Sequence, residues 1–321
     1  MLMRQFPGLF LGALLTLGVG VSPALAGSYP SKPITLIIPM GAGGSHDLNA
    51  RVFTSVMPEF LGQAIVVKLM PGVSGQRGTA VAARAKPDGY TLLFTHNYLD
   101  QLQQHIEPLP YDTTEDLVTV ARINFGPILL VVPADSPFKT LRQLLEYAKA
   151  NPGELTLAHS GTWGAVFVPA VRILQQVGAE LTFTPYKGGG PAMRALLAGD
   201  ADVTMAFPSV ALSLVQKGKI RLLASAGTKR TLPDVPTFAE LGFEDDIGMM
   251  NRVVMAPRGV APEKLHILRH AFAQLNSNKT YNRLMQKIGE NTAYMDGNDY
   301  EKLRTVQKDR YGALVRKITE N

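Results

Sequence analysis

Along this chain, short continuous apolar runs alternate with stretches in which apolar residues recur every three or four positions. The first pattern predicts strands, and the second predicts helices that bury one face. Up to residue 125 the predicted order is strand 34–39, helix 48–60, strand 64–69, helix 79–85 and strand 91–95. A βαβαβ beginning of this kind indicates a mainly parallel sheet covered by helices.

A second block with its own helix signals follows residue 125. Thr140 is placed to cap a helix that Gly153 ends, and Pro191 and Gly199 are placed to open and close another. The other predicted elements are strands 128–132, 155–158, 181–184, 203–207, 220–224 and 252–256, and helices 164–176, 262–277 and 300–317. The pattern therefore predicts two α/β blocks.

The first block is small and has few strands, so the C-terminal helices are expected to cover its sheet. This predicts a first lobe of residues 27–125 plus 251–321 and a second lobe of residues 126–250, with the chain crossing between them twice. The expected fold class is α/β with two lobes. Open α/β sheets bind ligands beyond the carboxyl ends of their strands, so a ligand site is expected in the cleft.

The N-terminus has the three parts of a secretory signal peptide over residues 1–26. Arg4 supplies the positive charge, residues 10–21 form an uncharged apolar run, and a small-x-small site predicts cleavage after Ala26. The alternative is a membrane anchor, but the apolar run is too short to span a bilayer. We therefore expect an exported, periplasmic protein.

Composition excludes several classes of function. Hydrophobic residues make up 46% of the chain and charged residues 18%, which indicates a folded core rather than disorder. The chain has no cysteine, so thiol catalysis and thiolate metal sites are excluded. The net charge is +6, but export and the lack of a basic run argue against nucleic acid. A positive field suits anionic small molecules, or serves solubility alone.

Six short segments, taken in order, resemble one family. They are YPSKPI (29–34), PMGAGGSHD (39–47), KPDGYTLL (86–93), AKANPG (148–153), PYKGG (185–189) and LPDVPT (232–237). Together they resemble the periplasmic receptors of tripartite tricarboxylate transporters, also called Bug receptors. The resemblance implies a type II periplasmic-binding-protein fold with two lobes and a central ligand cleft. It also implies a small carboxylate ligand, transporter membrane subunits as partners, and no chemistry on the ligand.

A glycine-rich loop precedes the first predicted helix. The backbone N–H groups of Gly43 and Gly44 can approach an anion, the helix N-terminus adds positive charge, and Ser45 can donate a hydroxyl. Alternatively, this is a tight turn with Ser45 as an ordinary N-cap. The resemblance favours ligand contact. Asp47 matches an aspartate of the family and is expected to hold the loop's N–H groups rather than face a carboxylate.

The loop 159–164 is predicted to be the equivalent loop of the second lobe. Ser160, Gly161 and Thr162 resemble the family's second carboxylate loop, which usually reads Ser-Ser-Gly-x-Gly-Ser. His159 and Ala165 depart from that pattern. Two such loops facing across a cleft would hold both ends of a dicarboxylate.

Four further side chains are candidates for the site. His96 and Asn97 follow a predicted strand at its carboxyl end, and Phe207 has the same position in the second lobe. Relatives carry an aspartate near Phe207, and its absence argues against an amino-acid ligand. Trp163 either packs on an aromatic ligand or packs in the protein interior. His46 either bonds a carboxylate, with pH dependence if it is charged, or is solvated.

The enzyme motifs fail on spacing. His46 interrupts a dinucleotide-binding glycine motif, and no lysine follows the loop as in a phosphate-binding loop. Ser160 lacks the glycine that a hydrolase nucleophile elbow needs, because Ala158 stands there. His266 and His270 lie four apart without the third ligand of a metal site. No cofactor, metal or catalytic residue is predicted.

The prediction is a monomeric receptor that closes over a mono- or dicarboxylate, aromatic ones included, and passes it to transporter membrane subunits. Two alternatives remain at this point. One is an orphan receptor that serves a sensor system. The other is a periplasmic serine hydrolase that uses Ser160 with a histidine.

Overall fold

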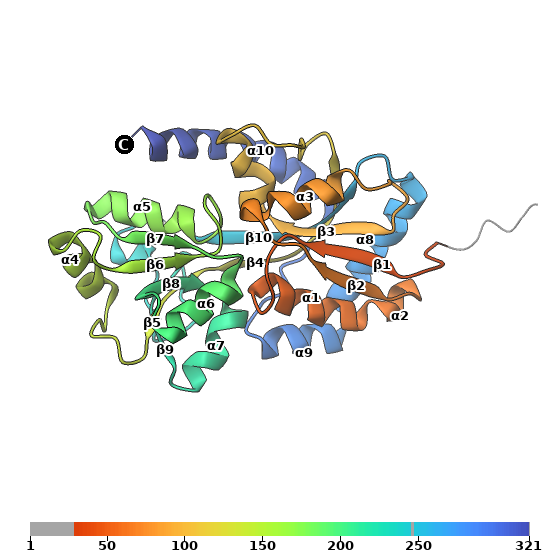
Figure 1. Cartoon of the computed structure of the whole chain (residues 1–321). Coiled ribbons are helices and arrows are strands. Elements are labelled where there is room, and N and C mark those ends of the chain that lie inside the picture. The colour runs from red at the N-terminus through yellow and green to blue at the C-terminus, as the bar shows by residue number, and fades with distance from the viewer. Residues whose placement is uncertain (1–28, 245–246, 321) are drawn as a thin grey trace, which may run out of the picture.

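The computed structural model describes residues 29–244 and 247–320, which form two α/β lobes, each built on its own sheet (Figure 1). The α/β class and the two-lobed architecture are confirmed. The predicted signal peptide, residues 1–26 with cleavage after Ala26, lies outside the described residues.

The first sheet is mixed rather than mainly parallel. Its strands are β1 (Ile34–Ile38), β2 (Ile65–Leu69), β3 (Thr91–His96), β4 (Leu117–Pro127), β10 (Met249–Pro257) and β11 (Met295–Asp296). Their order is β11-β4-β10-β3-β1-β2. β1 runs parallel to β2 and β3, as the βαβαβ pattern predicts, with Thr35 opposite Val66 and Thr91. β10 pairs antiparallel with both β3 and β4.

The second sheet is built from the middle of the chain. Its strands are β5 (Leu129–Pro133), β6 (Thr156–His159), β7 (Thr182–Pro185), β8 (Val203–Ala206) and β9 (Ile220–Ser225). Their order is β7-β6-β8-β5-β9, with β6 parallel to β7 and β8, and β5 antiparallel to β8 and β9.

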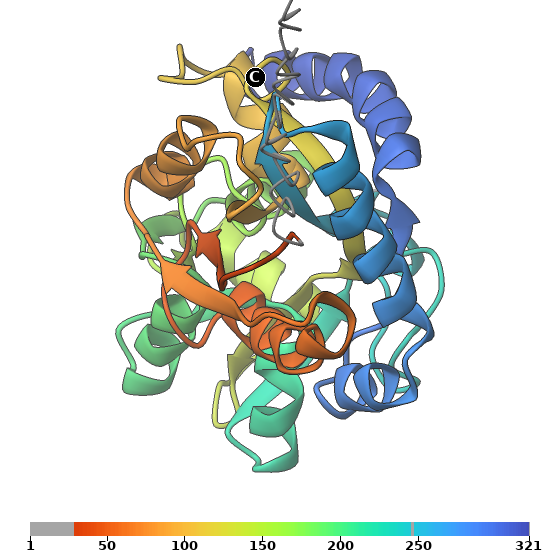
Figure 2. The same cartoon turned by 90° about the vertical axis from the view of Figure 1, so that its right-hand side faces the viewer.

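Helices cover both faces of the first sheet. They are α1 (Ser45–Val56), α2 (Pro58–Leu61), α3 (Gln76–Ala83), α8 (Pro262–Ser277), α9 (Lys279–Lys287) and α10 (Gly297–Thr319). Leu36 of β1 packs with Phe53 of α1 and Phe272 of α8, whereas its neighbour Ile37 packs on the other face with Tyr300 of α10. This alternation is what a strand buried on both faces requires. Figure 2 shows the blue C-terminal helices on the lobe of the red and orange N-terminal elements.

The second sheet is covered in the same way. Leu130 and Val132 of β5 pack into the cluster formed with α4 (Leu141–Ala150) and α5 (Phe167–Val177). Leu129 and Val131 pack on α6 (Gly189–Ala198) and α7 (Pro208–Gln216). Short turns of helix complete the fold, namely η1 (Val73–Gly75), η2 (Tyr98–Leu102), η3 (Gln103–His105) and η4 (Ala239–Leu241).

Most predicted elements are confirmed to within a few residues, and the helix over 262–277 matches α8 at both ends. Thr140 caps α4, because its hydroxyl oxygen accepts a hydrogen bond from the Gln143 N–H at 3.2 Å. Five helix starts are displaced by two or three residues. Those predicted at residues 48, 79 and 300 lie three residues earlier, at Ser45, Gln76 and Gly297. The helix predicted from residue 164 begins at Phe167, since residues 160–166 form turns, and α6 begins two residues before Pro191.

The apolar pattern does not predict β4, α7 or α9. β4 contains the polar residue Asn124, which is fully buried, so the segment does not show the continuous apolar run expected of a central strand. The apolar run 210–215 in α7 resembles a strand. α9 is mostly polar and buries only Tyr281 and Met285 among its nine residues, so it lacks a wide apolar face.

The chain passes between the lobes at Ile128 and again at Gly248. The two segments are joined there by a hydrogen bond from the Ile128 N–H to the Gly248 carbonyl oxygen at 2.9 Å. Gly248 has a φ of 77°, and a Cβ added to it would lie 2.4 Å from Cγ2 of Ile128, so glycine is needed. We propose these crossings as the hinge between residues 27–125 plus 251–321 and residues 126–250.

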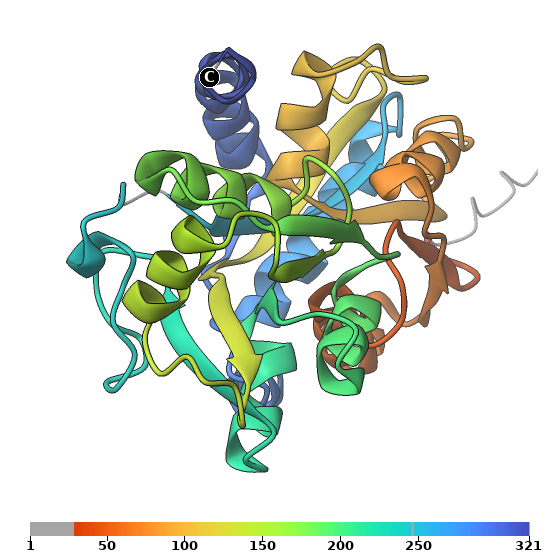
Figure 3. The same cartoon turned by 60° about the vertical axis from the view of Figure 1, so that its left-hand side comes forward.

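Helix α10 contacts both lobes. Tyr300, in its first turn, packs under the first sheet, whereas Val315 and Ile318 near its end join the core of the second lobe. The Ile318 carbonyl oxygen accepts a hydrogen bond from Nε2 of Gln175 in α5 at 3.0 Å. Figure 3 shows the end of α10 beside α5. The last turns of α10 therefore support the second lobe.

A buried ion pair links the lobes behind the hinge. Arg252 of β10 is fully buried and donates to Glu290 at 3.0 and 3.3 Å and to Oδ1 of Asn124 at 2.9 Å. Oε1 of Glu290 accepts hydrogen bonds from the Ser209 hydroxyl at 2.6 Å and the Ser209 N–H at 3.3 Å. Because Ser209 lies in the first turn of α7, Glu290 joins the first lobe to the second.

We expect Glu290→Ala to lower the free energy of unfolding by about 3–5 kcal/mol, because it leaves Arg252 buried without its counter-charge. Asp299→Ala, which removes an exposed ion pair with Lys302, is the control and should leave the urea midpoint unchanged. Equal midpoints for the two variants would contradict a structural role for the buried pair.

Candidate functional site

A cavity of about 40 Å³ lies between the lobes, beside the carboxyl ends of β1, β3 and β8. This is the edge at which α/β sheets bind ligands. Six predicted site residues line it, namely Gly44, Ser45, His46, His96, Ser160 and Phe207. The other lining residues are Met40, Ala165, Val166, Gly189, Met205, Ala206, Val210 and Met250.

The N-terminus of α1 faces this cavity without a side-chain cap. Gly44 is its N-cap residue, and Ser45 and His46 form its first turn. Asp47 points back to the loop, where its Oδ2 accepts a hydrogen bond from the Gly43 N–H at 2.9 Å. Its other oxygen pairs with Arg51 at 2.9 Å. Asp47 therefore stabilises the loop, and the positive end of the helix faces the cavity.

The second helix N-terminus at the cavity belongs to α6, a predicted helix that the sequence did not place at the site. Gly188 is its N-cap residue, again without a side-chain cap, and Gly189 lines the cavity. The PYKGG segment at 185–189, a glycine pair just before a helix, is the signal that could have identified it. Both α1 and α6 therefore direct backbone N–H groups to this region.

Glycines let the two lobes meet backbone to backbone at this point. The Gly41 N–H donates to the Lys187 carbonyl oxygen at 2.8 Å. A Cβ added to Gly190 would lie 2.2 Å from the Ala42 carbonyl oxygen, and one added to Gly44 would lie 3.3 Å from the Gly190 nitrogen. The N-termini of α1 and α6 are therefore neighbours and form a single positive pole.

His46 is buried and neutral. Its Nε2 lies 3.2 Å from the Thr95 carbonyl oxygen, and its ring packs on Phe94 and His96 at centroid distances of 5.0 and 5.2 Å. Burial, His96 and Arg252 lower the pKa of His46 well below its usual value. The alternative of a solvated histidine is therefore wrong, because His46 is only 5% exposed.

His96 is neutral as well. Burial, with a contribution from the charge on Arg252, lowers its pKa to about 3. Within the described part of the chain, its buried Nδ1 has no hydrogen-bond partner. Phe207 separates the cavity from the ion pair behind it, because the Arg252 guanidinium stacks 4.6 Å from the Phe207 ring.

Six predicted site residues are not in the cavity lining: Gly43 and Asp47 of the loop before α1, and Asn97, Gly161, Thr162 and Trp163. Asn97 uses its amide within the fold, since its Oδ1 accepts from the Asn251 N–H at 2.9 Å and its Nδ2 donates to Tyr311. Gly161 lines a neighbouring hollow with Ser160, and Thr162 is exposed. Ser160 is therefore the member of that loop that the structure brings to the cavity.

Trp163 packs in the protein rather than at the cavity. Its ring lies 5.5 Å from the Phe167 ring, against the core of the second lobe. Its φ is 58°, in the left-handed region that is rare for a large side chain. The loop, not the helix α5, therefore sets its position, because α5 begins only at Phe167.

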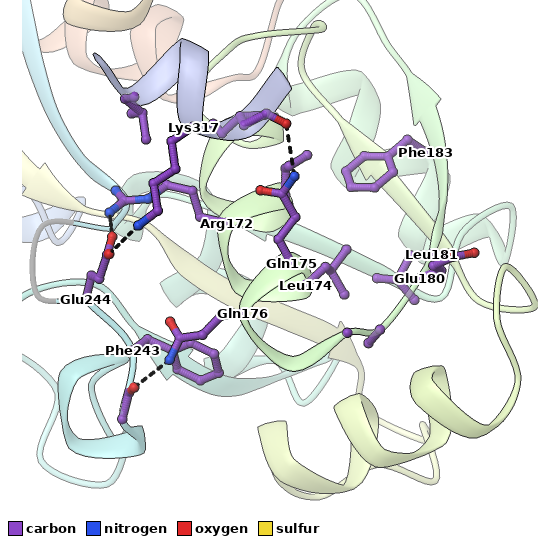
Figure 4. Close-up of a pocket in the computed structure, with 16 residues that line it drawn as sticks. Arg172, Leu174, Gln175, Gln176, Glu180, Leu181, Phe183, Phe243, Glu244 and Lys317 are labelled. Carbon is purple, nitrogen blue, oxygen red and sulfur yellow. Dashed lines mark hydrogen bonds and ion pairs between the residues drawn. The ribbon is translucent and has the colours of Figure 1, made fainter. Parts of the chain in front are cut away.

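A larger hollow of about 1030 Å³ lies on the outside of the second lobe, between α5 and the end of α10 (Figure 4). Its polar groups are engaged with one another: Glu244 pairs with Arg172 and Lys317, and Gln176 donates to the Gly242 carbonyl oxygen. No predicted site residue lines it. The interlobe cavity is therefore the better candidate site.

Metal and serine-nucleophile chemistry find no support in residues 29–244 and 247–320. No group of three His, Asp or Glu side chains there could hold a metal ion. His266 and His270 stack on each other, exposed on α8. The histidine rings nearest the cavity, His46 and His96, contact each other and the backbone at Thr95.

The fold and the interlobe cavity define a two-lobed periplasmic binding protein of type II. The sequence profile of the tripartite tricarboxylate transporter family receptor matches residues 49–319, and the chain belongs to this family. It is a periplasmic solute-binding receptor of the Bug type, as its sequence segments predict. In the part of the chain that the structure describes, no helix is both long and apolar enough to cross a membrane.

Relatives agree in sequence and in fold. The chain is 33% identical to Protein BugT of Bordetella pertussis over 84% of this chain and 83% of BugT. MatC of Rhodopseudomonas palustris, solved with bound malate, is 25% identical and has a TM-score of 0.83, covering 89% of this chain and 100% of MatC. Another R. palustris protein, solved with adipate, is 26% identical with a TM-score of 0.86, covering 91% and 98%.

The buried neutral His96 predicts a loss of stability in acid. Because its folded pKa of about 3 lies below the usual value of 6.5, the unfolded state binds more protons between these values. The stabilisation is therefore complete above pH 6.5 and is lost as the pH falls towards 3, by up to about 1.4 kcal/mol per pH unit.

Urea unfolding at pH 7, 6 and 5 measures this slope. We expect His96→Gln to reduce the slope between pH 6 and 5 by about 1 kcal/mol per unit. The control His270→Gln, at an exposed histidine of α8, should leave it unchanged. Identical slopes in wild type and His96→Gln would show that His96 is not buried and neutral.

Proposed function

We propose that this receptor captures a small carboxylate in the periplasm and delivers it to the membrane subunits of a tripartite tricarboxylate transporter. The observation that carries the proposal is the pair of uncapped helix N-termini, α1 and α6, beside one cavity. Unsatisfied N–H groups and two helix dipoles at one point are suited to an anion.

The side chains at this pole support the same chemistry. Ser45 and Ser160 line the cavity and carry hydroxyls that can donate to carboxylate oxygens. No described residue hydrogen-bonds to the Ser45 hydroxyl. Gly43 and Asp47 hold the loop in place. Malate in MatC and adipate in the second R. palustris relative are both carboxylates, which supports this ligand class.

The receptor acts as a monomer, without cofactor, catalysis or nucleic acid, and its signal peptide is removed after Ala26. The alternative is a receptor with the same fold that binds its ligand and then signals through a sensor protein, without serving transport. Transport and sensing both require the same carboxylate site, so a binding measurement tests the site but does not distinguish the two roles. Measuring uptake of the ligand in a strain that lacks the receptor distinguishes them, because uptake falls only if the receptor serves transport.

A thermal-shift screen tests the ligand class. Wild-type protein is heated with a panel of mono- and dicarboxylates, aromatic ones included, and with sugars and amines for comparison. A ligand at 100 times its dissociation constant adds about 2.7 kcal/mol by mass action, so a carboxylate should raise the midpoint clearly. A shift with a sugar or an amine, and none with any carboxylate, would refute the proposal.

Ser45→Ala should weaken binding of the best carboxylate by about 10- to 100-fold, because a hydrogen bond to a charged group contributes roughly 1.5–3 kcal/mol. Ser55→Ala is the matched control on the same helix, since the Ser55 hydroxyl is exposed and bonds the Val52 carbonyl oxygen. Calorimetric titration of both variants measures the effect. Equal affinities would remove Ser45 from the site.

Gly190→Ala tests whether the closed contact of the lobes is needed for binding. The new Cβ would meet the Ala42 carbonyl oxygen at 2.2 Å, so we expect at least about tenfold weaker binding with little loss of stability. Gly126→Ala is the control, because its Cβ would make only an ordinary contact at 3.6 Å with Glu290. Wild-type affinity in Gly190→Ala would show that binding does not need this contact.

A further inference from the structure

We propose that the ligand is a small hydroxy-monocarboxylate, with its carboxylate at the pole formed by α1 and α6, its body against an apolar wall, and its hydroxyl donating to Nδ1 of His46. This inference rests on the proposed function, since it names the subclass of carboxylate that the same site selects. It makes His46 a specificity-determining residue.

The site has one anion-binding end rather than two. The helix N-termini at Gly44 and Gly189 line the same cavity, and a Cβ on Gly44 would lie 3.5 Å from the Gly189 nitrogen. Ser160, expected to hold a second carboxylate across the cleft, lines this cavity together with Gly189. A single cluster of donors suits a single carboxylate.

Away from the helix N-termini, the described residues of the cavity lining carry no charge. No Lys, Arg, Asp or Glu side chain is among the described residues that line the cavity. Val166, Met205, Val210 and Met250 supply apolar surface, and the nearest buried cation, Arg252, is covered by Phe207 and paired with Glu290. A second carboxylate would lose its water there without gaining a counter-charge, which is costly.

His46 presents a hydrogen-bond acceptor at the cavity. The Thr95 carbonyl oxygen only accepts, so the Nε2 of His46 that faces it at 3.2 Å carries the proton. In a neutral ring Nδ1 then has only a lone pair, and burial keeps this ring neutral. Within residues 29–244 and 247–320, no group hydrogen-bonds to Nδ1 of His46.

An acceptor of this kind selects a ligand donor. A lone pair on Nδ1 repels a carboxylate oxygen but accepts a hydroxyl proton. His96 adds a second unpartnered ring nitrogen in the same lining, with the side chain only 5% exposed. Leaving such groups without a partner on ligand binding costs free energy, so a ligand without a hydroxyl is rejected.

The volume limits the size of the ligand. A cavity of about 40 Å³ corresponds to only about three water-sized probes, at roughly 10–15 Å³ for each. At this volume, an aromatic ring requires the lobes to lie further apart than a chain of three or four carbons does.

Calorimetric titration of the wild-type protein with matched four-carbon acids tests the proposal. The probes are 2-, 3- and 4-hydroxybutyrate, butyrate, which lacks the hydroxyl, and succinate, which carries a second carboxylate. We expect at least one hydroxybutyrate to bind about tenfold or more tightly than both butyrate and succinate. Succinate binding most tightly, or butyrate matching every hydroxybutyrate, would overturn the inference and leave the proposed function intact.

Failure of every carboxylate, here and in the thermal-shift panel, would instead refute the proposed function itself. Three variants add an independent readout. His46→Leu should weaken the best hydroxybutyrate about tenfold and leave butyrate unchanged, whereas Ser45→Ala should weaken both ligands alike. Equal losses for both ligands in His46→Leu would overturn the role of Nδ1. His46→Gln, which keeps an acceptor oxygen, should retain part of the preference, and the wild-type comparison stands even if a variant does not fold.

Discussion

The backbone contact between the two lobes is the constraint on which the candidate site depends. Gly41 and Gly44 of the first lobe meet Lys187 and Gly190 of the second at distances that leave no room for a side chain. Only because glycines stand there do the N-termini of α1 and α6 become neighbours. The positive pole thus lies where the two lobes meet, and neither lobe possesses it alone.

The buried polar groups near this contact form two sets, a charged pair and, closer to the cavity, two neutral histidines. Arg252 and Glu290 hold the charge, joining the lobes through Ser209, and Phe207 covers that pair. In front of it, burial and the nearby cation keep His46 and His96 neutral. The cavity therefore has donors at one end, two neutral histidine rings at its side and an apolar wall.

Pattern reasoning succeeded where one local signal decides the structure. Apolar runs identify β1 and β3, Thr140 identifies the start of α4, and the family segments identify the fold. It failed where polar side chains are buried, as in β4 with Asn124, because their partners lie far away in the chain. It placed Ser160 at the cavity correctly but not Gly161 and Thr162, since α5 begins only at Phe167 and its N-terminus does not serve that loop.

The sequence by itself determined the two α/β blocks, the glycine loop before α1, the supporting role of Asp47 and membership of a receptor family, because each rests on neighbouring residues or ordered segments. The tertiary structure decided which residues share one cavity. It brought α6 to the site, turned the Asn97 amide into the fold and buried His46. These outcomes depend on how the lobes pack, and packing between residues about 150 positions apart, such as Gly41 and Lys187, leaves no local pattern in the chain.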